Sequence, residues 1–225
     1  MKITFISDTH TKHNQITQDL PGGDLILHTG DISSLGREHE IENFCKWFSK
    51  LDNYTNKVFI AGNHDFGFEN NMRDVIMEIV YSFGNIKYLQ DSYTIIDGVK
   101  IYGSPWQPEF NGWAFNLPRN GDILKSKWDN IPDDTDIVLT HGPVFGHLDR
   151  IKNINENLGC ELLAERFSIF KPKIHVCGHI HSGNGFQYSD GINYFNASVL
   201  NESYNYHYKP LTIDWDKKTN EVIIL

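Results

Sequence analysis

The segment from Lys173 to Ser182, KIHVCGHIHS, places two imidazoles, His179 and His181, one residue apart after an apolar run. The run is rich in β-forming residues, so it predicts a strand that delivers both histidines into the loop at its end. Histidine is the commonest metal-ligating side chain in proteins. Taken alone, however, the pair fits an ordinary polar loop about as well as a metal site. What decides between them is whether other strands end in the same way.

Four other predicted strands end in residues of the same kind. These residues are Asp8 and His10, Asp31, Asn63 and His64, and His141. Because ligands bind beyond the carboxyl ends of strands in layered α/β folds, we expect the five loops to form one site. Its carboxylates, imidazoles and single carboxamide suit two divalent ions such as Mn²⁺, Fe²⁺ or Zn²⁺. The absence of a thiolate in these loops argues against a structural zinc cage.

Each of these residues also has an ordinary structural explanation. Asp8 and Asp31 could cap helices that follow the strands. His10 and His141 could be loop histidines with satisfied hydrogen bonds, and Asn63 could be a turn residue. The repetition of the pattern at five strand ends is what favours metal ligation over these explanations.

The other histidines lack such a pattern. His28, inside the second predicted strand, is interpreted as a core residue or as a support for Asp31. We expect a structural role for His175 within its strand, and a surface position for three histidines without a surrounding motif, namely His13, His39 and His207.

Helical periodicity appears between the strands, which predicts an α/β fold. The expected helices are Arg37 to Lys50, Asn70 to Phe83, Asp122 to Trp128 and Glu161 to Phe170. In the second of these, helical spacing predicts an inward face of Met72, Val75, Ile76, Ile79 and Val80. A β-hairpin is expected around Asp97-Gly98, and a polar loop at residues 153–156. No linker divides the chain, so we expect a single domain over residues 1–225, built from two packed sheets with helices outside.

The composition narrows the range of partners. The chain has 225 residues, 40% of them hydrophobic, and a net charge of −9, which disfavours binding to long nucleic acids or to anionic membranes. An acidic protein that binds phosphate must supply positive charge locally, and metal ions can do so. No apolar run approaches the roughly 18 residues of a membrane span. Cys45, Cys160 and Cys177 are expected to be reduced and buried, in a cytoplasmic protein.

The motifs D-x-H, G-D, G-N-H-[DE], T-H-G-P and G-H-x-H occur in that order between residues 8 and 181. As an ordered set they resemble the calcineurin-like metallophosphoesterase superfamily. Within it, GSPWQPEFNGWAFNLPR and HVCGHIHSGNG are similar to MPPED-type proteins and their relatives among class III cyclic-nucleotide phosphodiesterases. The resemblance implies a four-layer αββα sandwich with a dinuclear metal centre.

The resemblance also implies a role for each matching residue. The first metal would bind Asp8, His10 and His181, the second would bind Asn63, His141 and His179, and Asp31 would bridge the two. His64 would lie just outside the ligand set, with Asp65 as its orienting carboxylate. The expected cofactors are two divalent ions, with Mn²⁺ as the first choice and Fe²⁺/Fe³⁺ or Zn²⁺ as alternatives.

The expected activity is hydrolysis of small phosphodiesters, cyclic nucleotides included, by a metal-activated bridging hydroxide. His64 would stabilise charge or protonate the leaving group. Trp106, Phe110 or Trp113 could stack a base or an aryl group, while His147 could contact phosphate, although a position on the rim is preferred. The alternatives are a phosphomonoesterase or nuclease, a low-turnover nucleotide-binding regulatory protein, and a side activity on carboxylic esters or anhydrides. A homodimer is compatible with the family.

Overall fold

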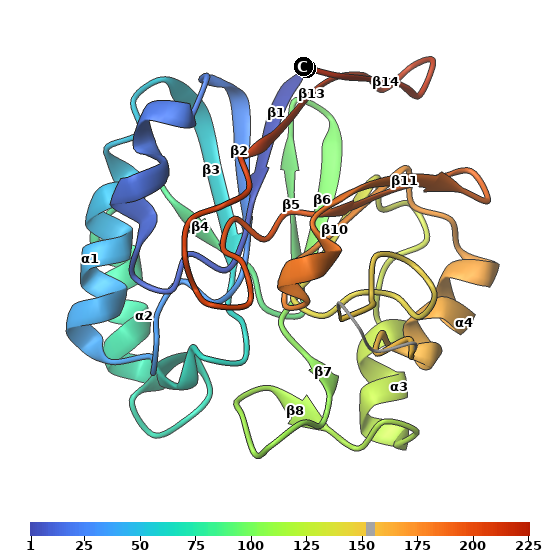
Figure 1. Ribbon diagram of the computed structural model, residues 1–225, viewed down its shortest axis with the longest axis horizontal. Coiled ribbons are helices and arrows are strands. Elements are labelled where there is room, and N and C mark those ends of the chain that lie inside the picture. The colour runs from blue at the N-terminus through green and yellow to red at the C-terminus, as the bar shows by residue number, and fades with distance from the viewer. Residues whose placement is uncertain (152–155) are drawn as a thin grey trace.

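The computed structural model describes residues 1–151 and 156–225, which form two six-stranded sheets with helices on their outer faces (Figure 1). Apart from Glu156, the polar loop expected at residues 153–156 lies outside the described residues. The layers follow the order helix, sheet, sheet, helix. The expected four-layer αββα sandwich is therefore confirmed.

The first sheet has the strand order β14-β13-β1-β2-β3-β4. Its strands are β1 (Lys2–Ile6), β2 (Gly23–Thr29), β3 (Tyr54–Ile60), β4 (Lys87–Tyr88), β13 (Leu211–Asp216) and β14 (Glu221–Ile224). Strands β1 to β4 are parallel, with Ile3 opposite Leu25 and Leu27 opposite Val58, whereas β13 and β14 join as antiparallel strands. The carboxyl ends of β1, β2 and β3 consequently lie at one edge of this sheet.

The second sheet has the strand order β11-β12-β10-β9-β6-β5. Its strands are β5 (Ser92–Ile96), β6 (Val99–Ser104), β9 (Ile137–Thr140), β10 (Ile174–Cys177), β11 (Gly185–Ser189) and β12 (Ile192–Asn196). The four inner strands are parallel, so the ends of β9, β10 and β12 also share an edge. The β5-β6 hairpin turns at Asp97-Gly98 as predicted, with φ of 50° and 77°, values that favour glycine at the second position.

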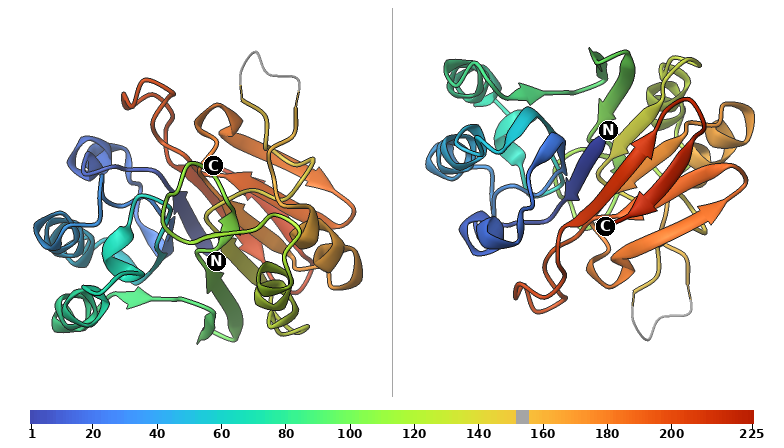
Figure 2. Two further views of the ribbon diagram at one scale, coloured as in Figure 1. Left: turned by 90° about the horizontal axis from the view of Figure 1, so that it is seen from below. Right: turned by 90° about the horizontal axis from the view of Figure 1, so that it is seen from above.

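The helices cover the outer faces of the two sheets. Helices α1 (Glu38–Ser49) and α2 (Arg73–Ser82) pack on the first sheet, and α3 (Asp122–Asp129) and α4 (Glu161–Ile169) pack on the second. Figure 2 shows the two helix pairs on opposite flanks of the paired sheets. The bounds of all four helices agree with their predicted bounds to within three residues.

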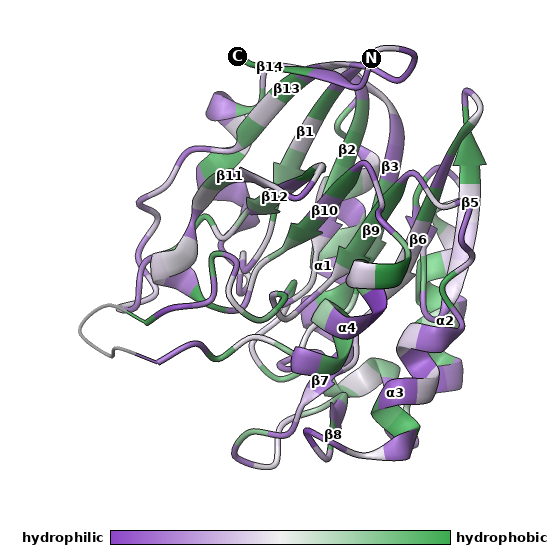
Figure 3. Ribbon diagram, turned by 90° about the vertical axis from the view of Figure 1, so that its right-hand side faces the viewer, coloured by the Kyte–Doolittle hydropathy of each residue, from purple (hydrophilic) through white to green (hydrophobic). Residues whose placement is uncertain are grey.

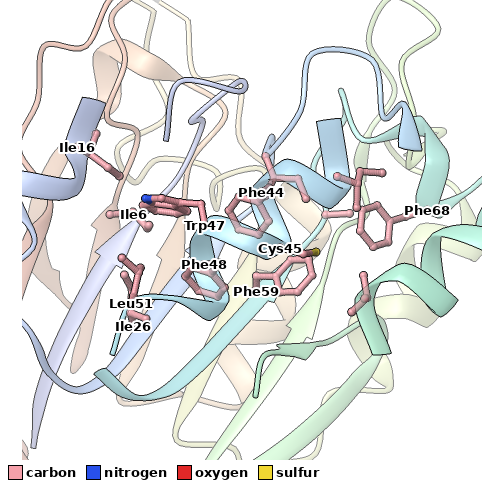
Figure 4. Packing of buried hydrophobic residues seen from close by; sticks show 14 of the residues in the cluster. Ile6, Ile16, Ile26, Phe44, Cys45, Trp47, Phe48, Leu51, Phe59 and Phe68 are labelled. Atoms are coloured by element: carbon pink, nitrogen blue, oxygen red, sulfur yellow. The ribbon is translucent and has the colours of Figure 1, made fainter. Parts of the chain in front are cut away.

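Apolar side chains fill three layers of core. The layer between the sheets includes Phe5, Leu27, Ile101 and Phe195, which come from both sheets. Figure 3 shows that the strands carry most of the hydrophobic colour. In the layer beneath α1, Phe44 and Phe48 pack against Phe59 of β3 (Figure 4). Burial on both faces explains why β2 reads as a continuous apolar run.

Several local predictions need correction. Met72 and Val75 are 38% and 40% exposed, because Met72 precedes α2 and the buried face of that helix is formed by Ile76, Met77 and Val80. His13, expected at the surface, is buried against Trp47 in a 3₁₀ helix, η1 (His13–Asp19), that the sequence did not predict. By contrast, His39 and His207 are exposed and His175 is buried, as expected.

Two further expectations are confirmed. All three cysteines are buried and unpaired. Among the described residues, no helix has the length and apolar character needed to cross a membrane.

Candidate metal centre and active site

The carboxyl ends of strands from both sheets meet at one cluster of carboxylates and imidazoles. The cluster contains three groups whose potential ligand atoms lie within 4.8 Å of one another. These groups are Asp8 with His10 and His181, His10 with Asp31 and His64, and Asp8 with Asp31 and His141. The groups share members, so the cluster is continuous and joins loops that are far apart in the sequence.

Three histidines of the cluster are held in the same way. The Nδ1 atoms of His141, His181 and His64 donate to the carbonyl oxygens of Thr29, Asn201 and Ser34, at 2.8, 2.9 and 2.9 Å. A carbonyl can only accept, so these bonds fix the tautomer and leave each Nε2 available. This is the arrangement by which proteins orient imidazoles toward a metal.

The remaining contacts show where a cation would fit. His10 Nε2 is buried without a hydrogen-bond partner and lies 3.6 Å from Asp31 Oδ2. His141 Nε2 lies 3.3 Å from the same oxygen and 2.9 Å from Asn63 Oδ1, while His181 Nε2 lies 3.5 Å from Asp8 Oδ1. A buried nitrogen with no partner carries a free-energy cost that a bound cation would remove. The donor set therefore fits divalent metal ions.

His179 and Asn63 complete the convergence that the sequence predicts. The His179 ring lies 5.1 Å from the His141 ring, and both His179 and Asn63 line the cavity beside Asp31. The seven predicted metal-ligating residues are thus all brought together at one place.

The backbone of the cluster is strained. Asp8, His10, Asp31 and His179 have φ of 54°, 39°, 55° and 66°, values that L residues rarely adopt. Such strain is concentrated at functional sites because the surrounding structure must hold it. Gly178 allows a close approach here, since a Cβ at this position would overlap Ser7 Oγ and Asp8 Oδ2.

The electrostatics of the cluster favour ionised carboxylates. Burial alone would raise the pKa of Asp8, but the hydrogen bond and charge of His181 hold it well below its usual value. Burial likewise opposes ionisation of Asp31, but the charge and hydrogen bond of His141, together with the charge of His10, outweigh it and lower the pKa of Asp31. Although burial lowers the pKa of His141, the Asp31 charge raises it to about 9. Burial lowers the pKa of His10 to about 4 and that of His179 to about 3, so these two imidazoles are neutral. The two ionised carboxylates and the neutral imidazoles of His10 and His179 make a cation-binding environment, in which a metal ion would replace the proton that Asp31 favours on His141.

Three supporting residues were not singled out from the sequence, namely Ser198, Asn201 and Asn196. Ser198 Oγ donates to Asp8 Oδ2 at 2.7 Å, and the Asn201 carbonyl holds His181. Asn196 Nδ2 also donates to the carbonyls of Gly178 and Ile180, which shapes the loop of His179 and His181. The signal was present, because the segment Asn196-Ala197-Ser198 places polar residues at the end of a strand, like the other five motifs.

The predicted role of Asp65 is wrong. Its carboxylate accepts hydrogen bonds from the backbone of Ile32, Ser33 and Gly62 and from Ser33 Oγ, whereas the ring of His64 is held by Ser34. These four donors occupy both oxygens of the Asp65 carboxylate. It therefore joins the β2 and β3 loops and does not orient His64. His28 bonds Thr9 Oγ1 and the Gly30 amide, so it is a buried core residue.

A cavity of about 380 Å³ opens beside the cluster. Its walls include His64, His179, Phe110, Trp113 and Tyr204. Phe110 is 54% exposed with its ring 6.4 Å from that of His179, which leaves a face free for a substrate.

The other two predicted substrate contacts lie elsewhere. The Trp106 indole donates to Asp91 and packs against Phe115, and the His147 ring stacks on Tyr194 at 4.0 Å. Neither residue lines the cavity. The loop that carries Trp106 packs this side chain against the core layers beneath both helix pairs, where its apolar surface is partly buried.

Comparison with known proteins identifies the fold and the family. A family model described as Calcineurin-like phosphoesterase matches residues 1–183. The chain is 39% identical over 233 residues to Metallophosphoesterase domain-containing protein 1 of Homo sapiens, covering 95% of this chain and 70% of the relative. It is 33% identical to UPF0046 protein C25E10.12 of Caenorhabditis elegans, covering 95% of this chain and 80% of the relative.

Solved structures share the fold at low sequence identity. The protein TT1561 of Thermus thermophilus matches with a TM-score of 0.65 and 13% identity, over 99% of this chain and 97% of that one. The sulfate thiohydrolase SoxB of Thermus thermophilus matches with a TM-score of 0.54 and 13% identity, over 95% of this chain and 40% of that one. The family model and the 39% identical relative establish that the chain belongs to the calcineurin-like phosphoesterases, a family of metal-dependent phosphoesterases.

Proposed function

We propose that this protein is a dinuclear metal-dependent phosphodiesterase that acts on small diesters, cyclic nucleotides included. The observation that carries the proposal is the sharing of ligands within the cluster. Asp31 belongs to two of the three ligand groups, beside His10 in one and His141 in the other. A carboxylate placed between two sets of imidazoles suits a bridge between two ions.

This geometry supports one set of ligands for each ion. Asp8, His10 and His181 would hold one ion, and His141, with Asn63 and His179 beside it, would hold the second. Oxygen and imidazole donors suit Mn²⁺, with iron or Zn²⁺ as alternatives. When bound, two such ions supply Lewis-acid charge and lower the pKa of water.

The protein's own residues position the ester and assist its cleavage. His64 could donate a proton from Nε2 to the leaving oxygen only as an imidazolium, because the proton on Nδ1 is already bonded to the Ser34 carbonyl; the donation would leave His64 neutral. As the bond from phosphorus to that oxygen breaks, water supplies the new oxygen, so a diester becomes a monoester and an alcohol. The carboxylates of Asp8 and Asp31 remain ionised and would hold the cations, which would supply positive charge to the phosphate.

The cavity supports a small substrate. Its volume of about 380 Å³ lies at the lower end of the range for small-molecule sites. Phe110 offers an aromatic face next to His179 for a base or an aryl group. The net charge of −9 gives no general attraction for a long polyanion.

The test is hydrolysis of an aryl phosphodiester and the matching monoester by chelator-treated protein, with and without added Mn²⁺. We expect Mn²⁺ to restore diester cleavage in the native protein but not in Asn63→Ala, which removes one proposed ligand. Preferential monoester cleavage would replace the diesterase by a phosphomonoesterase. Absence of cleavage of both esters, with metal binding demonstrated by calorimetry, would reject the enzymatic proposal.

A further inference from the structure

Trp113 stacks against His64 in a way that sets this histidine apart from the others in the cluster. The two ring centroids are 4.1 Å apart, with 30° between the planes. We propose that Trp113 is a positioning residue that fixes the orientation of His64 for proton donation to the leaving group. The inference rests on the proposed role of His64 in phosphodiester cleavage.

The neighbours of His64 leave its ring little freedom. Trp113 covers one face, while His10 meets the ring edge-on, with centroids 4.6 Å apart and an interplanar angle of 85°. The ring of Tyr204 lies further away, at 6.3 Å. His10 and His181 contact Tyr204 only at steep angles of 72° and 76°. Only His64 thus combines a polar anchor with an aromatic ring stacked on its face, among the cluster histidines that the structure describes.

The backbone ties the two residues to each other. The Ala114 amide donates to the carbonyl of Asn63 at 3.0 Å, and the Phe115 amide donates to Glu69 Oε2 at 2.7 Å. The loop that carries Trp113 is consequently fastened to the loop that carries His64. The indole also contacts the ring of Phe66, with centroids 5.8 Å apart, which supports it from the same loop.

Hydrogen bonds alone would not fix the imidazole. The backbone amide of His64 donates to Asp31 Oδ1 at 2.8 Å, and Nδ1 donates to the Ser34 carbonyl at 2.9 Å. The ring can still turn about its Cβ–Cγ bond as this single hydrogen bond bends, and that rotation would swing Nε2 away from the leaving oxygen. Stacking on an indole resists this rotation, because it would force the two rings apart.

The stack also changes the expected role of Trp113. The sequence suggests this residue as a platform for a base, but one face of the indole is already covered by His64. Phe110, whose ring meets that of His179 only edge-on, remains the ring available to the substrate. The two aromatic residues of one loop therefore have different functions.

The test compares diesters with good and poor leaving groups. A nitrophenolate leaves without a proton, whereas an alkoxide needs one, so loss of His64 alignment should affect only the second. For Trp113→Leu we expect kcat on the alkyl diester to fall about tenfold, with kcat on the nitrophenyl diester and both KM values within about twofold of the native enzyme. Trp113→Phe, which keeps a ring, should recover most of the loss.

A double-mutant cycle with His64→Ala provides the matched control. If Trp113 acts through His64, adding Trp113→Leu to His64→Ala should lower the rate no further. Phe110→Leu, in the same loop, should raise KM instead. A rise in KM for Trp113→Leu with unchanged kcat would make Trp113 a substrate contact, and an equal loss on both leaving groups would make it merely structural.

A spectroscopic measurement separates this inference from the proposed function. In Zn²⁺-loaded protein with labelled histidine, the indole should shift the ring carbon-bound proton signals of His64 upfield, and Trp113→Leu should abolish that shift. Unchanged His64 signals in the variant would overturn the positioning role whether or not the protein is active. If the His64 signals show the expected shift, and lose it in Trp113→Leu, in a protein that cleaves no phosphoester, only the proposed function is rejected.

Discussion

At the scale of single residues, the cluster depends on partners that hold its ligands. The Nδ1 atoms of His141, His181 and His64 are bound by backbone carbonyls, and Asp8 is bound by the Ser198 hydroxyl and the His179 amide. These partners determine which atoms face a cation, so replacing them should change metal affinity without removing a ligand.

Ser198→Ala tests this support. Removing the 2.7 Å hydrogen bond leaves one oxygen of Asp8 less well oriented, so we expect metal affinity to fall about tenfold. Competition with a chromophoric chelator measures the change. Ser7→Ala is the matched control, because this buried hydroxyl bonds the Gly30 carbonyl and not Asp8. Equal metal affinity for Ser198→Ala and the native protein would show that Asp8 needs no such support.

At the scale of elements, loops that follow different strands are joined by buried polar bonds. Asp65, in the β3 loop, accepts four hydrogen bonds, three of them from Ile32 and Ser33 of the β2 loop. Burial, reinforced by the charge of Asp31, raises the pKa of Asp65 to about 6. This carboxylate therefore keeps Asp31 in register with Asn63 and His64.

Asp65→Asn should weaken that connection. An amide has only one oxygen to accept the four donors, so we expect a loss of about 2–4 kcal/mol in the free energy of unfolding. Urea denaturation followed by circular dichroism measures it. Asp129→Asn, which breaks an exposed ion pair with Lys125, should change stability by less than about 0.5 kcal/mol. A similar small change for Asp65→Asn would contradict the bracing role.

The 3₁₀ helix η1 should make stability depend on pH through His13. This ring is buried against Trp47, and burial lowers its pKa from 6.5 to about 4. Because the unfolded chain takes up a proton at a higher pH than the folded one, stability falls as the pH drops from about 6.5 toward 4. Relative to His13→Gln, the native protein should lose about 2 kcal/mol between pH 7 and pH 5.

Urea denaturation of both proteins in chelator, at the two pH values, checks this expectation. His39→Gln serves as the control, because His39 is exposed and should show no such difference. If the free energies of unfolding of the native protein and of His13→Gln fall by the same amount between pH 7 and pH 5, protonation of His13 does not oppose folding, and the prediction is wrong.

At the scale of the whole molecule, the site lies where two sheets meet. Asp8, His10 and Asp31 follow strands of the first sheet, whereas His141 and His181 follow strands of the second. An ion held by Asp8 and His181 would therefore connect the sheets across their shared core. Metal binding and the cohesion of the sandwich should be coupled.

This coupling predicts stabilisation of both sheets by metal. At Mn²⁺ concentrations of about 100 times Kd, each site should add about 2.7 kcal/mol to the free energy of unfolding. Adding Mn²⁺ should slow the hydrogen exchange of backbone amides at the carboxyl ends of both β2 and β10. In Asp31→Asn, most of this slowing should be absent. Protection confined to one sheet would contradict a site shared between them.

The sequence by itself determined the five strands that end in the motifs, the four helices and the residues that gather at those strand ends. It could do so because the alternation of apolar residues in strands, their helical spacing in helices and the polar residues after strands are all local patterns. Parallel strands then bring their carboxyl ends to one edge of the sheet. His10, Asp31 and His141 could thus be grouped without coordinates, since their ordered motifs also mark the family.

Only the tertiary structure decided which partners hold those residues. Asp65 turns to the β2 loop, Trp113 stacks on His64, and Ser198 bonds Asp8 across 190 positions of sequence. His13 is buried because Trp47 and Phe44 of α1 lie against it, which no local pattern around His13 reveals. Such contacts depend on how the loops and layers pack in three dimensions. The chemistry of a side chain does not specify which residue, far away in the sequence, will lie beside it.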